Sequence, residues 1–234
     1  METIHTGGAA VVLLSGGLDS SVLLHYVARV LGRAPLHALS FDYGQRHAKE
    51  LECARWQADA VDAAVYRNID VTFLGDMVKG ASALVTGGKS VPDLDTLSGA
   101  QLDQPPTYVP NRNMILLSIA AAYAESHGIH EVYYGAQALD EYGYWDCTTE
   151  FLRRVNGALA LNRRDPVAVH APFIDKKKVE SVRLGIELGV NFVYTWSCYR
   201  GGSKACGKCP TCIERLNAFA EAGVEDPVRY EDAG

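Results

Sequence analysis

Short apolar runs alternate with longer amphipathic stretches along most of the chain. The run from Ala9 to Leu14 is typical of a strand buried on both faces. The stretch that follows places Val22, Tyr26 and Val30 on one side of a helix, and Gly32 ends it. The same pattern predicts strands over 9–14, 36–41, 64–71, 131–135 and 167–171, and helices over 20–30, 47–60, 114–127, 149–161 and 176–188. This alternation indicates right-handed βαβ units and an α/β fold with a doubly wound parallel sheet.

Local signals refine the ends of these elements and the domain organisation. Gly128 is placed to end the helix over 114–127, and Asp175 is predicted as the N-cap of the helix over 176–188. Residues 75–106 contain five Gly and three Pro and show little periodicity. Because a strong pattern resumes directly afterwards, we expect an insertion or active-site loop there rather than a linker. The chain, 1–234, is therefore predicted to be a single domain.

Composition narrows the class of protein. Hydrophobic residues make up 48% of the 234 residues and charged residues 21%, as in ordinary globular proteins. The formal charge of −6 argues against stable nucleic-acid binding, which needs clustered Lys and Arg. No apolar run approaches the roughly 18 residues of a membrane span, and Met1–His5 lacks the basic and apolar blocks of a signal peptide. We therefore expect a cytoplasmic protein.

The turn after the first strand, Ser15-Gly16-Gly17-Leu18-Asp19-Ser20-Ser21, has the composition of an anion-binding loop. Its two glycines let backbone N–H groups approach an anion closely, and its last two serines add hydroxyls at a helix start, where the dipole favours negative charge. The loop matches neither Gly-x-Gly-x-x-Gly nor Gly-x-x-x-x-Gly-Lys-Ser/Thr, so neither a dinucleotide fold nor a Walker ATPase is predicted. We interpret it as a phosphate cradle; the alternative is a strand-to-helix turn with a good cap.

Four of the six cysteines gather within a 15-residue window: Cys198, Cys206, Cys209 and Cys212. Such clustering is typical of metal binding rather than of a disulfide framework. Four thiolates satisfy tetrahedral Zn²⁺ and leave no position for water, so we predict a structural zinc site in segment 196–216. An iron–sulfur cluster is the alternative, since the last three cysteines have ferredoxin-like spacing and the first can be the fourth ligand. Cys53 is predicted to be a small buried hydrophobe, and Cys147 has no assigned task.

Several of these motifs resemble known families. The stretch from Ser15 to Ser20 is similar to the SGGxDS pyrophosphate loop of the N-type ATP pyrophosphatases, which include NAD synthetase and tRNA thiolases. Residues 41–47 (FDYGQRH), 108–113 (YVPNRN) and 195–199 (TWSCY) resemble the QueC family of 7-cyano-7-deazaguanine synthases, as does the cysteine spacing. The likeness runs over nearly the whole chain. It implies the adenine nucleotide alpha hydrolase-like (HUP) fold with a C-terminal four-cysteine zinc segment, and a homodimer.

The resemblance implies an ATP-dependent, AMP-forming carbon–nitrogen ligase. Such an enzyme adenylates the carboxyl group of 7-carboxy-7-deazaguanine, releasing pyrophosphate, lets ammonia displace AMP to give the amide, and then converts the amide into the nitrile. ATP and Mg²⁺ are expected at Ser15, Gly16, Gly17, Leu18, Asp19, Ser20 and Ser21. The implied catalytic residues are Asp19, Arg112 and Lys178, the two cations countering charge on phosphate or adenylate. The residues expected to contact the deazaguanine are Phe41, Tyr43, Gln45, Arg46, Tyr108, Gln137, Asp140 and Asp146.

The chain departs from the usual pattern of this family in two places. Asn111 stands where Gly is usual, and Asn tolerates a positive φ better than most residues. In the loop after the fourth strand, Trp145 stands where Pro is usual and Thr148 where Arg is usual. The loss of an Arg beside a carboxylate-bearing substrate removes a charge-assisted contact.

These departures keep other hypotheses open. A divergent QueC-like enzyme, of the kind found in anti-phage operons, would transfer the activated deazaguanine to another amine or to a protein acceptor. A tRNA thiolase-like enzyme with an iron–sulfur cluster is a weaker alternative. A nucleotide-binding or zinc-scaffold subunit without catalytic activity is the weakest, because the loop from Ser15 to Ser20 is intact.

Overall fold

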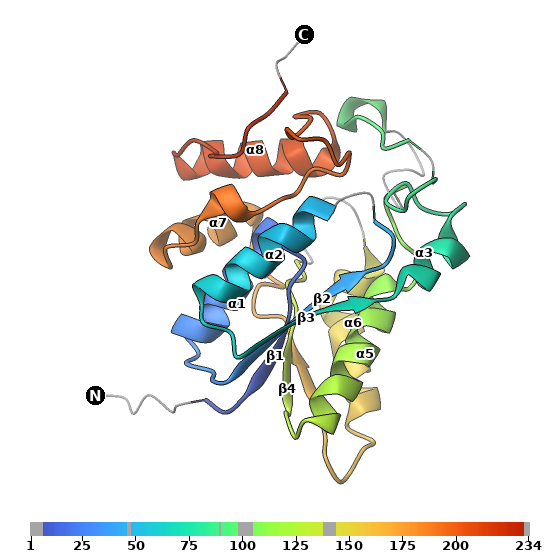
Figure 1. Ribbon diagram of the computed structural model, residues 1–234, viewed down its shortest axis with the longest axis vertical. Helices are drawn as coiled ribbons and strands as arrows, with labels where there is room; N and C mark the ends of the chain where they lie inside the picture. The colour runs from blue at the N-terminus through green and yellow to red at the C-terminus, as the bar shows by residue number, and fades with distance from the viewer. Residues whose placement is uncertain (1–6, 46–47, 89, 98–104, 138–143, 232–234) are drawn as a thin grey trace.

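The protein is built around a parallel five-stranded sheet in the order β3-β2-β1-β4-β5 (Figure 1). The computed structural model describes residues 7–45, 48–88, 90–97, 105–137 and 144–231, so Arg46 and Asp140 lie outside the described residues. The strands are β1 (Ala10–Leu13), β2 (Leu36–Asp42), β3 (Val65–Asp70), β4 (Glu131–Tyr133) and β5 (Ala168–His170). All four neighbouring pairs are parallel, which confirms the predicted doubly wound α/β fold.

Helices connect the strands and cover both faces of the sheet. They are α1 (Leu18–Arg29), α2 (Ala48–Ala60), α3 (Thr72–Val78), α5 (Arg112–Ser126), α6 (Thr149–Leu159), α7 (Lys178–Glu187) and α8 (Pro210–Ala222). Short 3₁₀ turns lie at Leu94–Thr96, Trp145–Cys147 and Phe192–Tyr194. In the parts of the chain that the structure describes, no helix is long and apolar enough to cross a membrane.

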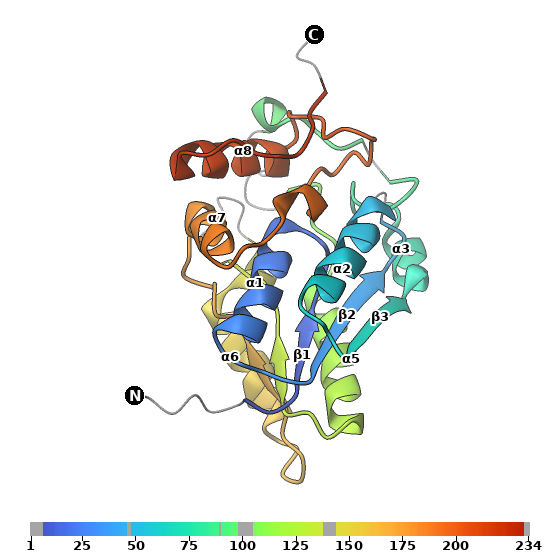
Figure 2. The ribbon, with the colours of Figure 1, turned by 60° about the vertical axis from the view of Figure 1, so that its left-hand side comes forward.

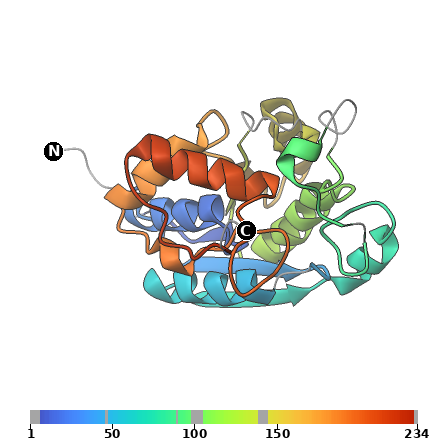
Figure 3. The same cartoon turned by 90° about the horizontal axis from the view of Figure 1, so that it is seen from above.

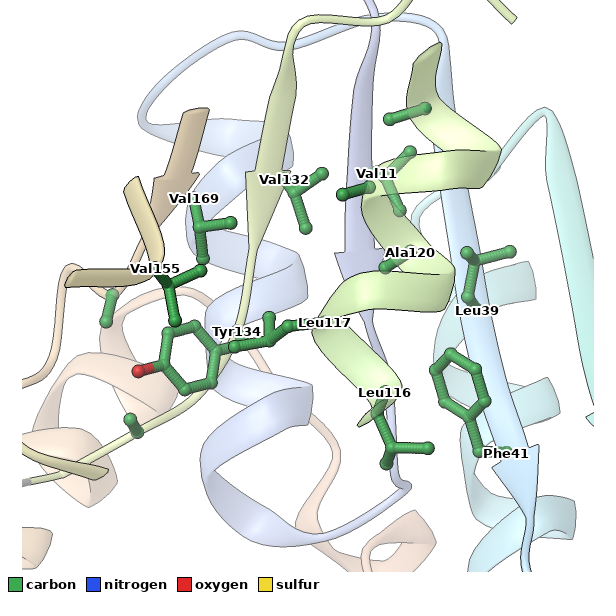
Figure 4. Packing of buried hydrophobic residues seen from close by; sticks show 14 of the residues in the cluster. Val11, Leu39, Phe41, Leu116, Leu117, Ala120, Val132, Tyr134, Val155 and Val169 are labelled. Carbon is green, nitrogen blue, oxygen red and sulfur yellow. The ribbon is translucent and has the colours of Figure 1, made fainter. Parts of the chain in front are cut away.

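Alternate strand residues supply two separate hydrophobic cores. Val11 and Leu39 face the α5 side of the sheet, where they pack with Leu117 of α5 (Figure 4). Their neighbours, such as Val12, point the other way and pack with residues of α1, α2 and α7, including Val22. Because side chains alternate along a strand, continuous apolar runs of this kind serve both faces at once.

Helix α8 and the segment before it lie at the carboxyl end of the strands. The strand arrows point toward this end in Figure 2, and Figure 3 looks onto it, with α8 in red on the near side. Helix α8 is attached to α7, where an Arg183 Nη2 donates to the Glu221 carbonyl oxygen at 2.9 Å. In parallel sheets of this kind ligands bind at the carboxyl ends of the strands, so α8 contributes to the functional end of the molecule.

The structure corrects several predicted boundaries. The helix expected over 176–188 begins at Lys178, and its N-cap is Lys177 rather than Asp175. The Lys177 N–H donates to Glu180 Oε2 at 2.8 Å, so a carboxylate three residues further on fixes the helix start. Helix α5 begins at Arg112, two residues earlier than expected, and α3 occupies the start of the predicted loop over 75–106. Helix α8 was not predicted.

Candidate active site

A cavity of about 290 Å³ lies at the carboxyl ends of β1, β2 and β4. It opens where β1 and β4 lie side by side and their connections leave toward opposite faces of the sheet, which is the usual ligand site of doubly wound folds. Its wall is assembled from the loop after β1, the end of β2, helices α2, α5 and α7, the segment after β4 and the cysteine-rich segment. Segments far apart in the sequence therefore share one chamber.

The loop after β1 is held in shape by its own hydroxyls and by contact with α2. The Ser15 and Ser20 hydroxyl oxygens are 2.9 Å apart, and the Gly17 N–H donates to Ser15 Oγ at 3.1 Å. Gly16 has a φ of +84°, and a Cβ there would lie 1.9 Å from the Glu50 carbonyl oxygen. Both the backbone conformation and the neighbouring helix therefore require glycine at this position.

The loop leads directly into the N-terminus of α1. Leu18 is the first residue of the helix, and Ser21 Oγ donates to the Gly17 carbonyl oxygen at 2.7 Å within the first turn. Gly135, which comes after β4, lies close to the start of α1. A Cβ at Gly135 would be only 3.2 Å from the Ser20 nitrogen. The helix N-terminus faces the cavity through Gly17, Leu18 and Ser20. Backbone N–H groups and the helix dipole together give this corner an electrostatic character that favours an anion.

Lys178, the first residue of α7, lies between two carboxylates at the cavity wall. Its Nζ is 3.2 Å from Asp19 Oδ2 and 3.4 Å from Glu214 Oε2. The second Asp19 oxygen, Oδ1, is buried and has no hydrogen-bond partner among the residues that the structure describes. A carboxylate oxygen with this freedom beside a phosphate loop suits the ligand preference of Mg²⁺.

Arg112 supplies a second cation from the start of α5. The preceding Asn111 has a φ of +56°, which confirms that asparagine adopts the left-handed turn at this position. Arg112 Nη1 donates to Tyr43 Oη at 3.3 Å, and the guanidinium carbon lies 5.7 Å from the centre of the Tyr43 ring. Burial, and to a smaller extent the charge of Cys198, raises the pKa of the nearby Glu50 to about 8, against the attraction of Arg112.

Four of the residues predicted to contact the deazaguanine line the cavity: Phe41, Tyr43, Gln45 and Gln137. The Gln45 amide shapes the turn after β2, accepting from the Tyr43 N–H at 2.8 Å and donating to the Phe41 carbonyl oxygen at 3.1 Å. Gln137 Nε2 donates to Ser181 Oγ at 2.7 Å, and its buried Oε1 has no partner within the described part of the chain.

Tyr108 and Asp146 lie beside the cavity and are not among its wall residues. Tyr108 Oη accepts from Trp145 Nε1 at 2.8 Å and from the backbone N–H of Asn111 at 3.1 Å. Asp146 is buried and accepts from the Asn113 N–H at 3.4 Å. Direct contact of either side chain with a substrate stays a prediction.

The wall also contains residues that sequence reasoning did not identify: Glu50, Thr107, Tyr134, Tyr144, Trp196, Tyr199 and Glu214. Most of these residues do not belong to a sequence motif that could have identified them in advance. Tyr199 and Trp196 flank Cys198 and lie in a segment already recognised for its resemblance, so a signal for them was present. The others are brought to the cavity by folding alone.

The four clustered cysteines converge on one point. Their Sγ atoms are buried and all lie within 4.8 Å of one another, and those of Cys206 and Cys212 are 3.9 Å apart. Tetrahedral Zn–S bonds of about 2.3 Å would place sulfurs about 3.8 Å apart, so the arrangement fits a single ion. Backbone N–H groups of Arg200 and Cys206 donate to Cys198 Sγ at 3.4 Å and 3.3 Å. The cluster can therefore hold a metal with four thiolate ligands.

The cysteine cluster is joined to the phosphate loop by a short segment. The Trp196 N–H donates to the Gly16 carbonyl oxygen at 2.9 Å, and Trp196 Nε1 donates to the Cys198 carbonyl oxygen at 3.1 Å. Trp196 is almost fully buried and forms part of the cavity wall. Cys53 packs against this cluster from α2, as expected for a small hydrophobe, whereas Cys147 lines the cavity.

The chain is similar to named proteins over nearly its whole length. The family model described as queuosine biosynthesis protein QueC matches residues 9–223. The 7-cyano-7-deazaguanine synthase of Caldicellulosiruptor bescii is 46% identical over 222 residues, which cover 95% of this chain and 97% of that relative. The synthase of Archaeoglobus fulgidus is 45% identical over 224 residues, covering 95% and 90%. That of Clostridium kluyveri is 42% identical over 228 residues, covering 95% and 97%. The chain therefore belongs to the QueC family.

Proposed function

We propose that this protein is a 7-cyano-7-deazaguanine synthase, an ATP-dependent ligase acting on the carboxyl group of 7-carboxy-7-deazaguanine. The observation that carries the proposal is the close approach of the glycine loop, Lys178 and Arg112 around one cavity in a chain of this family. A carboxylate oxygen is a poor leaving group, and adenylation converts it into one that leaves readily. A site for this reaction must bind polyphosphate and a flat heterocycle side by side.

In the first step a substrate carboxylate oxygen attacks the α-phosphorus of ATP, and pyrophosphate leaves. We assign pyrophosphate to the loop from Ser15 to Ser20 at the N-terminus of α1, which lines the cavity. Ser21 is fully buried, and its hydroxyl donates within the first turn of the helix. Lys178 and Arg112 counter the negative charge that develops around the α-phosphate. Asp19 Oδ1 would ligate Mg²⁺, which neutralises phosphate charge when bound.

In the second step ammonia attacks the acyl carbon, AMP leaves with its bonding electrons, and the nitrogen loses a proton to give the amide. The amide oxygen then attacks the α-phosphorus of a second ATP in the same site, and pyrophosphate leaves. Loss of AMP and of the two amide protons gives the nitrile. Phe41 and Tyr43 provide aromatic surface for the deazaguanine ring. The protein is proposed to act as a homodimer in the cytoplasm.

We assign zinc to the four-cysteine cluster, with a structural role. All four thiolates are needed to complete a tetrahedron, so no position remains for a reacting water. An iron–sulfur cluster would separate its cysteine ligands further than a single ion does, which disfavours the thiolase-like alternative. A colourless protein with one equivalent of zinc supports this assignment, and a brown protein with iron contradicts it.

The proposal is tested by incubating the protein with ATP, Mg²⁺, ammonium and 7-carboxy-7-deazaguanine and resolving the products by mass. The nitrile, AMP and pyrophosphate are expected, and Asp19→Ala should abolish AMP release while the circular dichroism spectrum is unchanged. Arrest at the adenylate or amide would instead point to the divergent relative that transfers the base to another acceptor. No observation on the described residues favours that alternative.

A further inference from the structure

Ser197 carries a hydroxyl group that the proposed mechanism does not use. The residue is partly exposed and belongs to the wall of the cavity. Its Oγ accepts a hydrogen bond from Arg215 Nη1 at 3.4 Å. Within the part of the chain that the structure describes, the hydroxyl hydrogen has no acceptor. A serine hydroxyl can donate and accept at once, so its capacity to donate remains unused.

Arg215 fixes the role that this hydroxyl plays toward the protein. The guanidinium is buried, and its Nε and Nη2 donate to the Asp226 carboxylate at 2.7 Å and 2.9 Å. Its Nη1 is shared between Ser197 Oγ and Thr195 Oγ1, the latter at 2.8 Å. A guanidinium can only donate, so both hydroxyls must accept from it and turn their own hydrogens elsewhere. Thr195 gives its hydrogen to the Phe192 carbonyl oxygen at 2.8 Å, whereas Ser197 lies at the cavity.

The backbone places Ser197 beside the phosphate loop. The N–H of the preceding residue, Trp196, donates to the Gly16 carbonyl oxygen at 2.9 Å. A Cβ on Gly17 would lie 3.7 Å from the Trp196 carbonyl oxygen, which belongs to the peptide bond that leads into Ser197. Ser197 and Gly17 both line the cavity. The unused donor therefore lies near the N-terminus of α1, where negative charge is favoured.

A phosphate oxygen is the ligand atom that suits this donor. Ionised phosphate oxygens only accept hydrogen bonds, and the loop from Ser15 to Ser20 already favours an anion at this corner. The guanidinium behind the Ser197 hydroxyl polarises its O–H bond and makes it a stronger donor. Hydrogen bonds to ionised acceptors are stronger than those between neutral groups, so this bond should add measurably to binding.

We propose that the Ser197 hydroxyl donates a hydrogen bond to the pyrophosphate part of ATP, so that the cysteine-rich segment supplies a further donor to the phosphate site. The inference rests on the proposed function, which identifies the nucleotide. Pyrophosphate gains negative charge as its bond to the α-phosphorus breaks. The hydrogen bond is therefore stronger in the transition state than in bound ATP, and it favours the reaction as well as binding.

Ser197→Ala removes the hydroxyl, and Ser203→Ala is its matched control. Ser203 lies in the same segment, is exposed, and is not among the described residues that line the cavity. Loss of a hydrogen bond to a charged oxygen should lower kcat/KM for ATP about ten- to a hundredfold in Ser197→Ala. The dissociation constant of 7-carboxy-7-deazaguanine, measured without ATP, should be unchanged. Ser203→Ala should keep the wild-type value of both quantities.

Three further measurements separate phosphate binding from a structural role. The dissociation constant of inorganic pyrophosphate, titrated with Mg²⁺ into the protein without substrate, should rise in Ser197→Ala by about the same factor as kcat/KM falls. Ser197→Thr keeps a hydroxyl on the same carbon and should recover most of that loss. The metal content and melting temperature of Ser197→Ala should match wild type, because Arg215 Nη1 keeps Thr195 as its acceptor.

The inference is overturned by unchanged kcat/KM for ATP and unchanged pyrophosphate affinity in Ser197→Ala, since the hydrogen is then given to solvent. Equal losses in Ser197→Ala and Ser203→Ala, or a loss of bound metal in proportion to the lost activity, would assign the effect to the segment as a whole and also overturn it. If wild type binds pyrophosphate but neither binds nor converts 7-carboxy-7-deazaguanine, the proposed function fails and the pyrophosphate titration alone decides the role of Ser197. A wild type that converts the deazaguanine beside an unaffected Ser197→Ala variant refutes only that role.

Discussion

Gly16→Ala is expected to disable the phosphate loop through steric contact with α2. The added Cβ would lie 1.9 Å from the Glu50 carbonyl oxygen and 2.8 Å from the Ala54 nitrogen. Both atoms belong to the backbone, so neither can rotate away, and relief requires the loop and α2 to separate. Gly16 also has a φ of +84°, which disfavours any residue with a Cβ.

The magnitude follows from these two contributions. An alanine in the left-handed region costs about 1–2 kcal/mol. Overpacking against rigid neighbours adds about 1–3 kcal/mol. The free energy of unfolding should therefore fall by roughly 2–5 kcal/mol. Because the loop must move to relieve the contact, its N–H groups should also lose their alignment with pyrophosphate, and a displacement of about 1 Å can lower kcat/KM roughly a hundredfold.

The control is Gly128→Ala, which has the same backbone problem without the contact. Gly128 has a φ of +64°, and nothing lies within 4 Å of a Cβ placed there. It should lose only about 1–2 kcal/mol and keep wild-type kinetics. Urea unfolding and pyrophosphate release measure the two effects. Equal destabilisation of both variants, or normal turnover by Gly16→Ala, would show that the contact with α2 does not hold the loop.

Three other predictions follow from the same structure. Cys209→Ser should lower the bound zinc and the melting temperature together, since one of four ligands to a structural metal is lost; an unchanged melting temperature contradicts a structural metal. Arg215→Ala should cost about 3–5 kcal/mol in urea unfolding, because it leaves the buried Asp226 carboxylate, 2.7 Å from Arg215 Nε, without its cation. The control for this variant is Arg153→Ala, at an exposed ion pair, which should cost less than about 1 kcal/mol. Folding raises the pKa of Glu50 from 4.5 to about 8. Between pH 4.5 and about 8, the folded chain therefore keeps a proton on Glu50 that the unfolded chain has released. Stability should fall as pH rises through that window, and Glu50→Gln should flatten the fall in urea unfolding measured across it.

The pattern of apolar runs was sufficient to predict the strands and most helices, because a buried parallel sheet imposes that pattern directly. Helix α3 was less accessible. It contains Gly75, a weak helix former, which is needed because a Cβ there would lie 2.3 Å from the Tyr43 carbonyl oxygen. Helix α8 begins inside the cysteine cluster with Cys209 as N-cap, which is not a usual capping residue. Pro210 at its first position was the available signal.

The candidate site likewise contains one part that the sequence could predict and another that it could not. The phosphate loop is contiguous in sequence and has a turn, hydroxyls and a helix start in fixed order, so its chemistry could be predicted. Glu50 and Tyr134 come from a helix surface and a strand end and acquire meaning only when the fold brings them to one cavity. The bond from Trp145 to Tyr108 joins segments 37 residues apart, which spacing alone does not reveal.

The bond from the Trp196 N–H to Gly16 ties the nucleotide pocket to the metal-binding segment. The segment that carries the four cysteines also supplies part of the cavity wall. Its contributions are Trp196, two residues before Cys198, Tyr199, directly after it, and Glu214, two residues after Cys212. With zinc as the proposed occupant, a newly made chain acquires a competent chamber only after it has captured its ion. Supply of that ion would then govern how much active enzyme a cell obtains from a given amount of polypeptide.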